Sequence, residues 1–288
     1  MLNLSKPDSL FNEGMKVLVY SEKHSEAKDI GWHRAGSKIA YYHNGIKKDL
    51  QKKSNSKTLY TMTFTFDFLY DDDTLYFAYC YPYNYSDVLD DLNKLSADPI
   101  KSTFCTRRTL CMSLAGNKVE MLTITSKNNL ENLSKRKGVF LTARVHPGES
   151  VGSWMMKGVI DYLIDETNEE AEALRQQFVF KIIPMLNPDG VINGNYRCSL
   201  AGCDLNRRWK APSKVLHPCI YNTKQLLIQF AKERELMVFC DFHGHSRRKN
   251  IFMYGCHNES NPEETRLYPY LMSKICPFFS FNYSRFGN

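Results

Sequence analysis

Strand-like and helix-like segments alternate along residues 83–288, and this alternation constrains the possible folds more than any other feature of the sequence. Apolar runs typical of strands occupy residues 118–125, 138–145, 178–186 and 236–242, and helical patterns occupy residues 153–167 and 221–233. Strands that alternate with helices favour a mostly parallel sheet with helices packed on both faces. The sequence therefore predicts an α/β domain over residues 83–288.

The first 82 residues have a different pattern. Runs rich in Tyr, Phe, Thr and Val are separated by turn-forming residues, and they occupy residues 15–22, 38–50, 58–70 and 74–83. Residues 61–68 alternate strictly between a polar and an apolar side chain, which is the period of a strand with one buried face. These runs predict a small antiparallel β-sandwich domain over residues 1–82, followed by a helix capped by Ser86.

Composition excludes several classes of protein. No apolar run approaches the roughly 18 residues that a membrane span needs, and the start of the chain has charges and a proline instead of the apolar stretch of a signal peptide. The nine cysteines form no C-x-x-C pair, which suits free thiols in a reducing compartment. We therefore expect a soluble cytosolic protein that binds no membrane.

The net charge of +7 is a modest basic excess. Basic residues cluster at 135–137, 207–210 and 246–249, and the last two clusters adjoin the motifs described below. Clusters beside a site favour an acidic substrate. No nucleic-acid-binding module accompanies them, so we expect no nucleic-acid partner.

Polar side chains follow three of the predicted strands. In chain order they are His146 and Glu149, then Asn187 and Asp189, then His243 and His245. Ligands of such sheets collect at the carboxyl ends of the strands, so we expect these residues at one edge. The segment N-P-D-G at 187–190 is typical of a turn.

Two imidazoles and one carboxylate form a ligand set typical of catalytic zinc. His146 and Glu149 are three residues apart, and the proline and glycine between them favour a loop that brings both side chains to one side. The third ligand must come from another strand end. His243 and His245 are two residues apart and face the same way in an extended chain, so spacing alone leaves the choice between them open.

Three motifs now carry a family resemblance. H-P-G-E-S at 146–150, N-P-D-G to N-R-R-W at 187–209 and D-F-H-G-H-S at 241–246 resemble the zinc metallocarboxypeptidases. The similarity is greatest to the cytosolic branch, which shortens acidic tails such as the polyglutamate chains of tubulin. Residues 21–42 and 76–87 also resemble the extra N-terminal β domain of that branch. The resemblance implies a carboxypeptidase-like α/β fold, tubulin or microtubules as partners, and the cytosol as location.

The resemblance also implies a metal site. By similarity His146, Glu149 and His243 are the ligands of one zinc ion per chain, which would decide between the two histidines. Asp204 is a candidate hydrogen-bond acceptor for a ligand imidazole, the kind of partner that orients such rings.

Substrate-binding roles follow from the same motifs. Arg197 corresponds to the catalytic arginine that polarises the scissile carbonyl, and Asn206 and Arg207 correspond to the pair that binds the C-terminal carboxylate of the substrate. A guanidinium suits both tasks, because it binds a carboxylate through two parallel hydrogen bonds and stabilises a developing oxyanion.

One element of the family mechanism is missing from the sequence: a general-base glutamate on a strand well beyond His243. The later carboxylates Glu259, Glu263 and Glu264 belong to a segment typical of the first turn of a helix. We therefore expect a catalytic domain that is incomplete at its C-terminal end. The alternatives are a chain that binds zinc and acidic tails without turnover, and an acyl-amide hydrolase, which would need no free substrate carboxylate.

Overall fold

The computed structural model describes residues 1–47, 58–128 and 130–287. The chain forms two compact units, each made of several segments. The larger one, here called the α/β unit, combines residues 17–35 and 67–244, and the small unit combines residues 1–16, 36–66 and 245–288. These units reflect how residues pack together and do not show that either part folds independently. The predicted domain boundary between residues 82 and 83 therefore stays a prediction.

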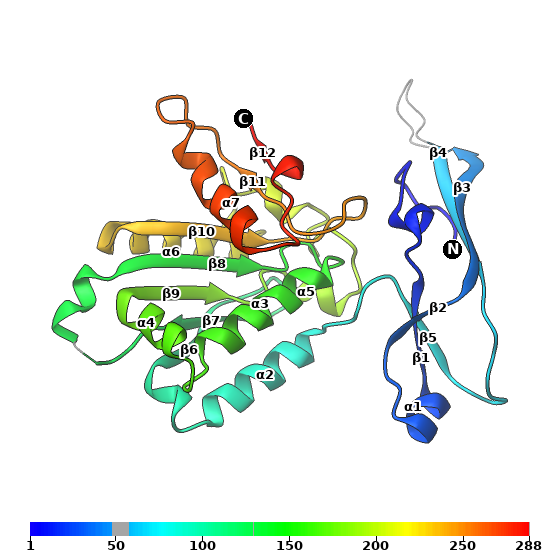
Figure 1. Ribbon diagram of the computed structural model, residues 1–288, viewed down its shortest axis with the longest axis horizontal. Coiled ribbons are helices and arrows are strands. Elements are labelled where there is room, and N and C mark those ends of the chain that lie inside the picture. Colours follow the sequence, from blue (N-terminus) through cyan, green and yellow to red (C-terminus); the bar gives the residue numbers. More distant parts are fainter. Residues whose placement is uncertain (48–57, 129, 288) are drawn as a thin grey trace. The chain divides into compact units, whose positions relative to one another are not determined.

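A five-stranded mixed sheet forms the centre of the α/β unit (Figure 1). Its order is β10-β8-β9-β7-β6, with β6 at Cys105–Met112, β7 at Lys118–Ile124, β8 at Lys137–Ala143, β9 at Phe178–Ile183 and β10 at Leu236–Phe242. Strands β8, β9 and β10 are mutually parallel, whereas β7 runs antiparallel to β9 and β6 antiparallel to β7. The predicted α/β fold is confirmed, with parallel strands at its centre, and strand β6 was not predicted from the sequence.

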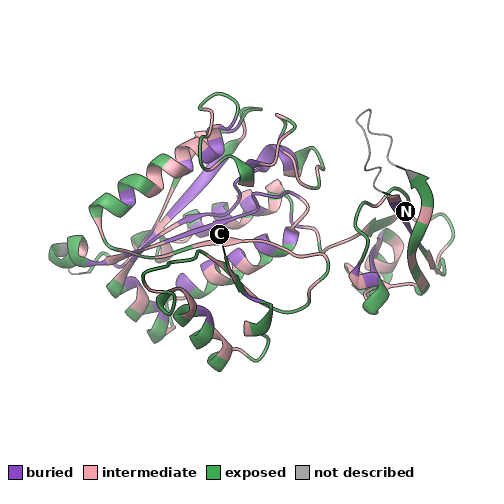
Figure 2. Cartoon of the chain, turned by 90° about the horizontal axis from the view of Figure 1, so that it is seen from above, coloured by how far each residue is buried: buried purple, intermediate pink, exposed green. Residues whose placement is uncertain are grey.

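Helices cover both faces of this sheet. On one face α2 (Tyr85–Ala97) and α3 (Ser150–Leu163) pack against β7, β8 and β9, and Met156, Ile160 and Leu163 of α3 lie in that core at helical spacing. On the other face α6 (Pro218–Glu233) buries Ile220 and Phe230. Figure 2 shows the buried residues concentrated in the strands and on the inner sides of the helices. Apolar burial of this kind is the main stabilising contribution to the unit.

Two local predictions need correction. Helix α2 is capped by Asn84 and not by Ser86, because Asn84 and Asp87 form a reciprocal capping box. The segment at 187–190 is more than a turn, because Asn187 accepts a hydrogen bond from Gly190 N and Pro188 starts the short helix α5 (Pro188–Ile192). Proline is favoured at a first helical position, where no N–H is needed.

Each unit also contains smaller sheets and further helices. The α/β unit also has an antiparallel sheet of order β2-β1-β5 (β1 Val17–Ser21, β2 His33–Ala35, β5 Leu75–Ala78) and helices α1 (Glu22–Lys28) and α4 (Glu169–Gln177). The small unit pairs β3 (Ser37–Lys47) with β4 (Thr58–Thr65) antiparallel and β11 (Tyr254–Gly255) with β12 (Arg285–Phe286) parallel, and it holds α7 (Glu264–Ile275). Antiparallel sheets from the N-terminal segments are thus confirmed.

Short 3-10 segments at Leu10–Glu13, Lys101–Thr103, Leu130–Lys135, Leu205–Arg207 and Phe281–Tyr283 complete the structure. Residues 48–50 of the strand predicted at 38–50 lie outside the described residues. Among the described residues, no helix is both long enough and apolar enough to cross a membrane.

Gly152 of α3 packs closely against the backbone at the end of β10. A Cβ atom on Gly152 would lie 2.7 Å from the carbonyl oxygen of Phe242, closer than real contacts allow. We expect Gly152→Ala to destabilise the chain by about 1–3 kcal/mol, because α3 or β10 must shift to relieve the overlap.

Gly158, in the same helix, provides the matched control. Nothing lies within 4 Å of the position of its Cβ, so Gly158→Ala should stabilise the chain by about 0.5–1 kcal/mol through helix propensity. Urea unfolding of both variants measures the difference. Equal stabilities for the two variants would contradict the close packing described at Gly152.

Candidate metal centre and substrate-binding residues

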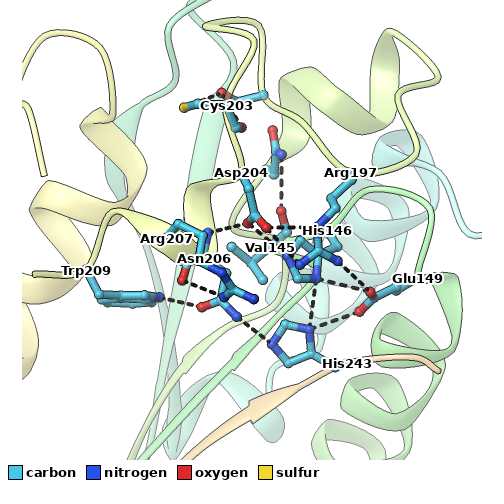
Figure 3. Close-up of polar contacts among 12 residues, drawn as sticks. Val145, His146, Glu149, Arg197, Cys203, Asp204, Asn206, Arg207, Trp209 and His243 are labelled. Atoms are coloured by element: carbon cyan, nitrogen blue, oxygen red, sulfur yellow. Dashed lines mark hydrogen bonds and ion pairs between the residues drawn. The ribbon is translucent and has the colours of Figure 1, made fainter. Parts of the chain in front are cut away.

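His146, Glu149 and His243 lie together at the carboxyl ends of parallel strands β8 and β10 (Figure 3). One potential ligand atom from each residue falls within a group whose members are all within 4.8 Å of one another. The two Nδ1 atoms are 3.1 Å apart, and the Glu149 carboxylate lies 3.1 Å from Nδ1 of His146 and 2.9 Å from Nδ1 of His243. Both imidazoles therefore direct the same nitrogen toward one carboxylate.

The loop that carries His146 and Glu149 is fixed by a buried arginine. Arg144 follows β8 with φ 59°, a left-handed conformation that is uncommon for a residue with a side chain. Its guanidinium donates to the carbonyl oxygens of Pro147 (2.7 Å) and Tyr83 (2.8 Å) and to Ser153 Oγ (2.9 Å). Burial lowers the pKa of Arg144 to about 10, so the side chain stays charged at neutral pH. These three bonds stabilise the turn.

A second contact fixes the same loop from the other side. Gly148 N donates to the carbonyl oxygen of Tyr196 over 2.8 Å, and a Cβ on Gly148 would lie 2.4 Å from the Tyr196 ring. Only glycine fits at this position, where the loop packs directly against the segment that holds Arg197.

The outer ring nitrogens of both histidines contact aspartates. Nε2 of His146 lies 3.0 Å from Asp204 Oδ1, so the predicted pairing of Asp204 with a histidine ring is confirmed. Nε2 of His243 lies 2.8 Å from Asp241 Oδ2, a contact that the sequence analysis missed. This contact could have been predicted, because residues two apart in an extended chain point to the same face.

Electrostatics make this cluster attractive to a cation. Burial alone would raise the pKa of Glu149, but hydrogen bonds from His146, His243 and the Gly244 N–H hold it well below its usual range. Burial alone would lower the pKa of His243, but hydrogen bonds with Asp241 and Glu149 raise it to about 9. Glu149 therefore stays ionised at neutral pH, and its negative charge faces both imidazoles.

Arg197 approaches the cluster from the loop after α5. Its Nε and Nη2 lie 2.8 and 2.7 Å from Asp204 Oδ2, and its Nη1 lies 3.8 Å from Glu149 Oε1. The Arg197 side chain keeps 41% of its surface exposed. Asp204 thus holds the guanidinium in place, while the exposed remainder of Arg197 can contact a bound molecule.

Asn206 and Arg207 lie in the 3-10 segment Leu205–Arg207, which Asp204 caps. Asn206 Oδ1 accepts from Trp209 Nε1 (2.8 Å), and its Nδ2 lies 3.4 Å from Nε2 of His243. Arg207 is exposed, and no ion pair between it and a carboxylate occurs within the described part of the chain. Its Nη1 donates to the carbonyl oxygen of Asn206 (3.2 Å), and the guanidinium has no carboxylate partner among the described residues.

The other polar residues at the strand ends have structural contacts. Asn187 Nδ2 donates to the carbonyl oxygen of Val145 (3.1 Å), and Asp189 accepts from Ala115 N (3.0 Å) and Asn117 Nδ2 (2.8 Å). His245 is outside the three-residue group, and its Nδ1 accepts the backbone N–H groups of residues 247 and 248. These residues shape the surrounding loops.

The donor set fits zinc. Two imidazole nitrogens and a carboxylate converge, and each imidazole has a carboxylate on its other nitrogen, as is usual for histidines that bind metals. Three protein ligands leave a coordination position for water or substrate, which is the arrangement of catalytic sites. Both histidines would bind the ion through Nδ1.

Comparisons with known proteins agree with this chemistry. Residues 96–275 match the zinc carboxypeptidase family. The chain is 50% identical over 279 residues to cytosolic carboxypeptidase 2 of Xenopus tropicalis, covering 96% of this chain and 28% of that protein. It is 47% identical over 290 residues to human cytosolic carboxypeptidase 2, covering 99% of this chain and 31% of that protein. The chain thus spans less than a third of the length of these relatives.

Solved structures support the fold. A metallo-carboxypeptidase from Burkholderia cenocepacia superimposes with a TM-score of 0.72 at 22% identity, covering 95% of this chain and 64% of that one. A putative carboxypeptidase A from Shewanella denitrificans gives a TM-score of 0.74 at 21% identity, covering 99% and 68%. On the match over residues 96–275 and the carboxypeptidase-like fold, the chain belongs to the zinc carboxypeptidase family.

Proposed function

We propose that this chain binds one zinc ion through His146, Glu149 and His243 and acts in the removal of glutamates from acidic protein tails such as those of tubulin. The main support for this proposal is that His146, Glu149 and His243 converge at one point. Arg197 lies beside this group, where Asp204 holds its guanidinium. When bound, zinc would polarise a carbonyl oxygen and activate a water molecule. The names of the relatives support a cytosolic location.

The roles of the chain's own residues follow from their positions. Arg197 is fixed by Asp204 and lies 3.8 Å from Glu149, so it can donate to the oxygen of a carbonyl held beside the metal ligands. For the terminal carboxylate of a peptide, Asn206 supplies an amide, and Arg207 supplies an exposed guanidinium whose Nη1 donates to the Asn206 carbonyl oxygen. This pair of carboxylate-binding residues favours a peptide terminus over an acyl-amide substrate.

The preference for acidic tails rests on charge. Arg207, Arg208 and Lys210 are exposed and adjoin Asn206. Exposed cations beside a binding site raise the local concentration of anionic peptides and increase their rate of association. Polyglutamate tails, as on tubulin, have this chemistry, so we propose them as the partners.

A second candidate function is binding without turnover by this chain. Within the described residues, the carboxylates in contact with His146 and His243 are those of Glu149, Asp204 and Asp241. Each of the three is already engaged by an imidazole, so none is free to act as general base. We infer that the 288-residue chain holds zinc and an acidic tail and that fast hydrolysis requires a further carboxylate.

Substrate binding can be tested with a pentaglutamate peptide and its C-terminally amidated form. If Arg207 binds the terminal carboxylate, both Arg207→Ala and amidation should weaken binding about 10- to 100-fold, the cost of one charge-assisted hydrogen-bonded pair. The affinities of the zinc-loaded chain are measured by fluorescence anisotropy at two salt concentrations, and higher salt should weaken them.

The two changes should not be additive, because they remove the same interaction. The amidated peptide should therefore bind the native chain and the Arg207→Ala variant with similar affinity. Arg208→Ala is the matched control: it removes an equal charge from the next residue and should affect both peptides alike. Equal affinity of the native chain for the free and amidated peptides would rule out the proposed role of Asn206 and Arg207.

A further inference from the structure

Asp241 of β10 lies between Thr142 on the neighbouring strand β8 and His243, a candidate metal ligand. It is the register partner of Thr142 across the parallel strands β10 and β8, so the two side chains share a face of the sheet. Thr142 Oγ1 donates to Asp241 Oδ1 over 2.7 Å, and Asp241 Oδ2 lies 2.8 Å from Nε2 of His243. Thr142 is fully buried, and the Asp241 side chain is 13% exposed. The carboxylate is thus held at both oxygens.

The contact determines which nitrogen of His243 keeps its proton when a metal ion binds. A carboxylate at Nε2 accepts a hydrogen bond and retains the proton there, so that Nδ1 is the nitrogen that gives up its proton to bind the metal ion. Nδ1 is the atom that lies 2.9 Å from Glu149 and 3.1 Å from Nδ1 of His146. The tautomer that Asp241 favours is therefore the one that can bind a metal ion in this group.

The amide of Asn206 cannot substitute for Asp241 in this task. Its Nδ2 lies 3.4 Å from Nε2 of His243, but an amide nitrogen only donates. The Trp209 indole occupies the amide oxygen and fixes this orientation. Among these contacts, Asp241 is the acceptor for the ring N–H.

The two aspartates of the site differ in how many groups they hold. Asp204 contacts His146, Arg197 and the backbone N–H of Asn206, so its replacement would disturb several groups together. Asp241 contacts only His243 and Thr142 in the described part of the chain. Its replacement is therefore a selective probe of one ligand.

We propose that Asp241 is a positioning residue that orients His243 for zinc, and that the Thr142 hydroxyl anchors it from the neighbouring strand. This inference rests on the proposed zinc site and adds two residues to it. A positioning carboxylate of this kind contributes to metal affinity because it fixes both the ring orientation and the tautomer of its histidine.

The test is the zinc dissociation constant of the full chain, measured by competition with a chromophoric chelator. Asp241→Ala should weaken zinc binding about 10- to 100-fold. Asp241→Asn keeps the shape of the side chain and should also weaken binding, because a neutral amide oxygen is a poorer acceptor. Thr142→Val should weaken binding about three- to tenfold through loss of one hydrogen bond, whereas Thr142→Ser should restore it.

A matched control lies in the same sheet. Thr123 of β7 accepts a hydrogen bond from Lys181 Nζ (2.8 Å), so Thr123→Val removes a strand hydroxyl away from the site and should leave zinc affinity unchanged. The visible spectrum of the cobalt-substituted chain adds a readout of ligand geometry, which should change in the Asp241 variants and not in Thr123→Val.

The outcomes separate this inference from the proposed function. Native zinc affinity in both Asp241 variants, or equal weakening by Thr142→Ser and Thr142→Val, would overturn the inference while the zinc site stands. A native chain that binds no zinc would overturn both.

Discussion

Replacing His243 by alanine is expected to reduce the zinc content of the purified chain to background, whereas replacing His245 should leave one zinc per chain. The two histidines are two residues apart, but Nδ1 of His243 faces Glu149 and His146, while Nδ1 of His245 accepts two backbone N–H groups. Loss of one of three protein ligands leaves too few donors to hold the ion against water.

His146→Ala should behave as His243→Ala does. Metal content is measured by inductively coupled plasma mass spectrometry after dialysis against dilute zinc, with circular dichroism to confirm that each variant is folded. Stoichiometric zinc in His243→Ala together with its loss in His245→Ala would show that the other histidine is the ligand.

The second large effect concerns turnover. We expect the zinc-loaded 288-residue chain to release glutamate from a polyglutamate peptide about 10²- to 10⁴-fold more slowly than a longer form of the protein that spans the length of its relatives. This range is the usual contribution of a positioned general base. Within the described residues, the carboxylates near His146 and His243 already pair with imidazole nitrogens, so none of them is free to act as that base.

A triple variant tests the alternative sources of a base. Glu259, Glu263 and Glu264 precede or open α7 in the small unit, and their joint replacement by glutamine should not alter the activity of the longer form. The contrary result would be a highly active 288-residue chain whose activity is lost in the triple variant. One of the three glutamates would then be the general base, and the proposal of binding without turnover would be wrong.

Much of the fold could be predicted because the apolar pattern is strong where the sheet is buried. The runs at 138–145 and 236–242 are bounded by polar residues and correspond to β8 and β10. Parallel neighbours end at the same edge, so the prediction that His146 and His243 meet followed from strand direction alone. Strand β6, which among the described residues pairs with β7 at the edge of the sheet, is largely polar and gave no such pattern.

Details that depend on tertiary contacts could not be predicted. The left-handed conformation of Arg144 is accompanied by hydrogen bonds from its guanidinium to the nearby Pro147 and Ser153 and to the distant Tyr83. The choice between His243 and His245 depends on the path of the chain after Phe242, where a Cβ on Gly244 would lie 2.8 Å from the Val151 side chain. Neither constraint is visible in the spacing of residues along the chain.

The pairing of Asp241 with Thr142 is a similar case. Alternation places Asp241 and His243 on one face, but the cross-strand neighbour depends on register, and register is set by the packing of the whole sheet. The hydrogen bond from Thr142 therefore emerged only with the three-dimensional structure.

A crystal structure of the zinc-loaded chain with anomalous data at the zinc absorption edge would locate the metal ion. We expect a single strong anomalous peak about 2.0–2.1 Å from Nδ1 of His146 and of His243 and about 2.0–2.2 Å from a carboxylate oxygen of Glu149. A peak bound by cysteine sulfurs or by His245, or the absence of any peak between these three side chains, would contradict it.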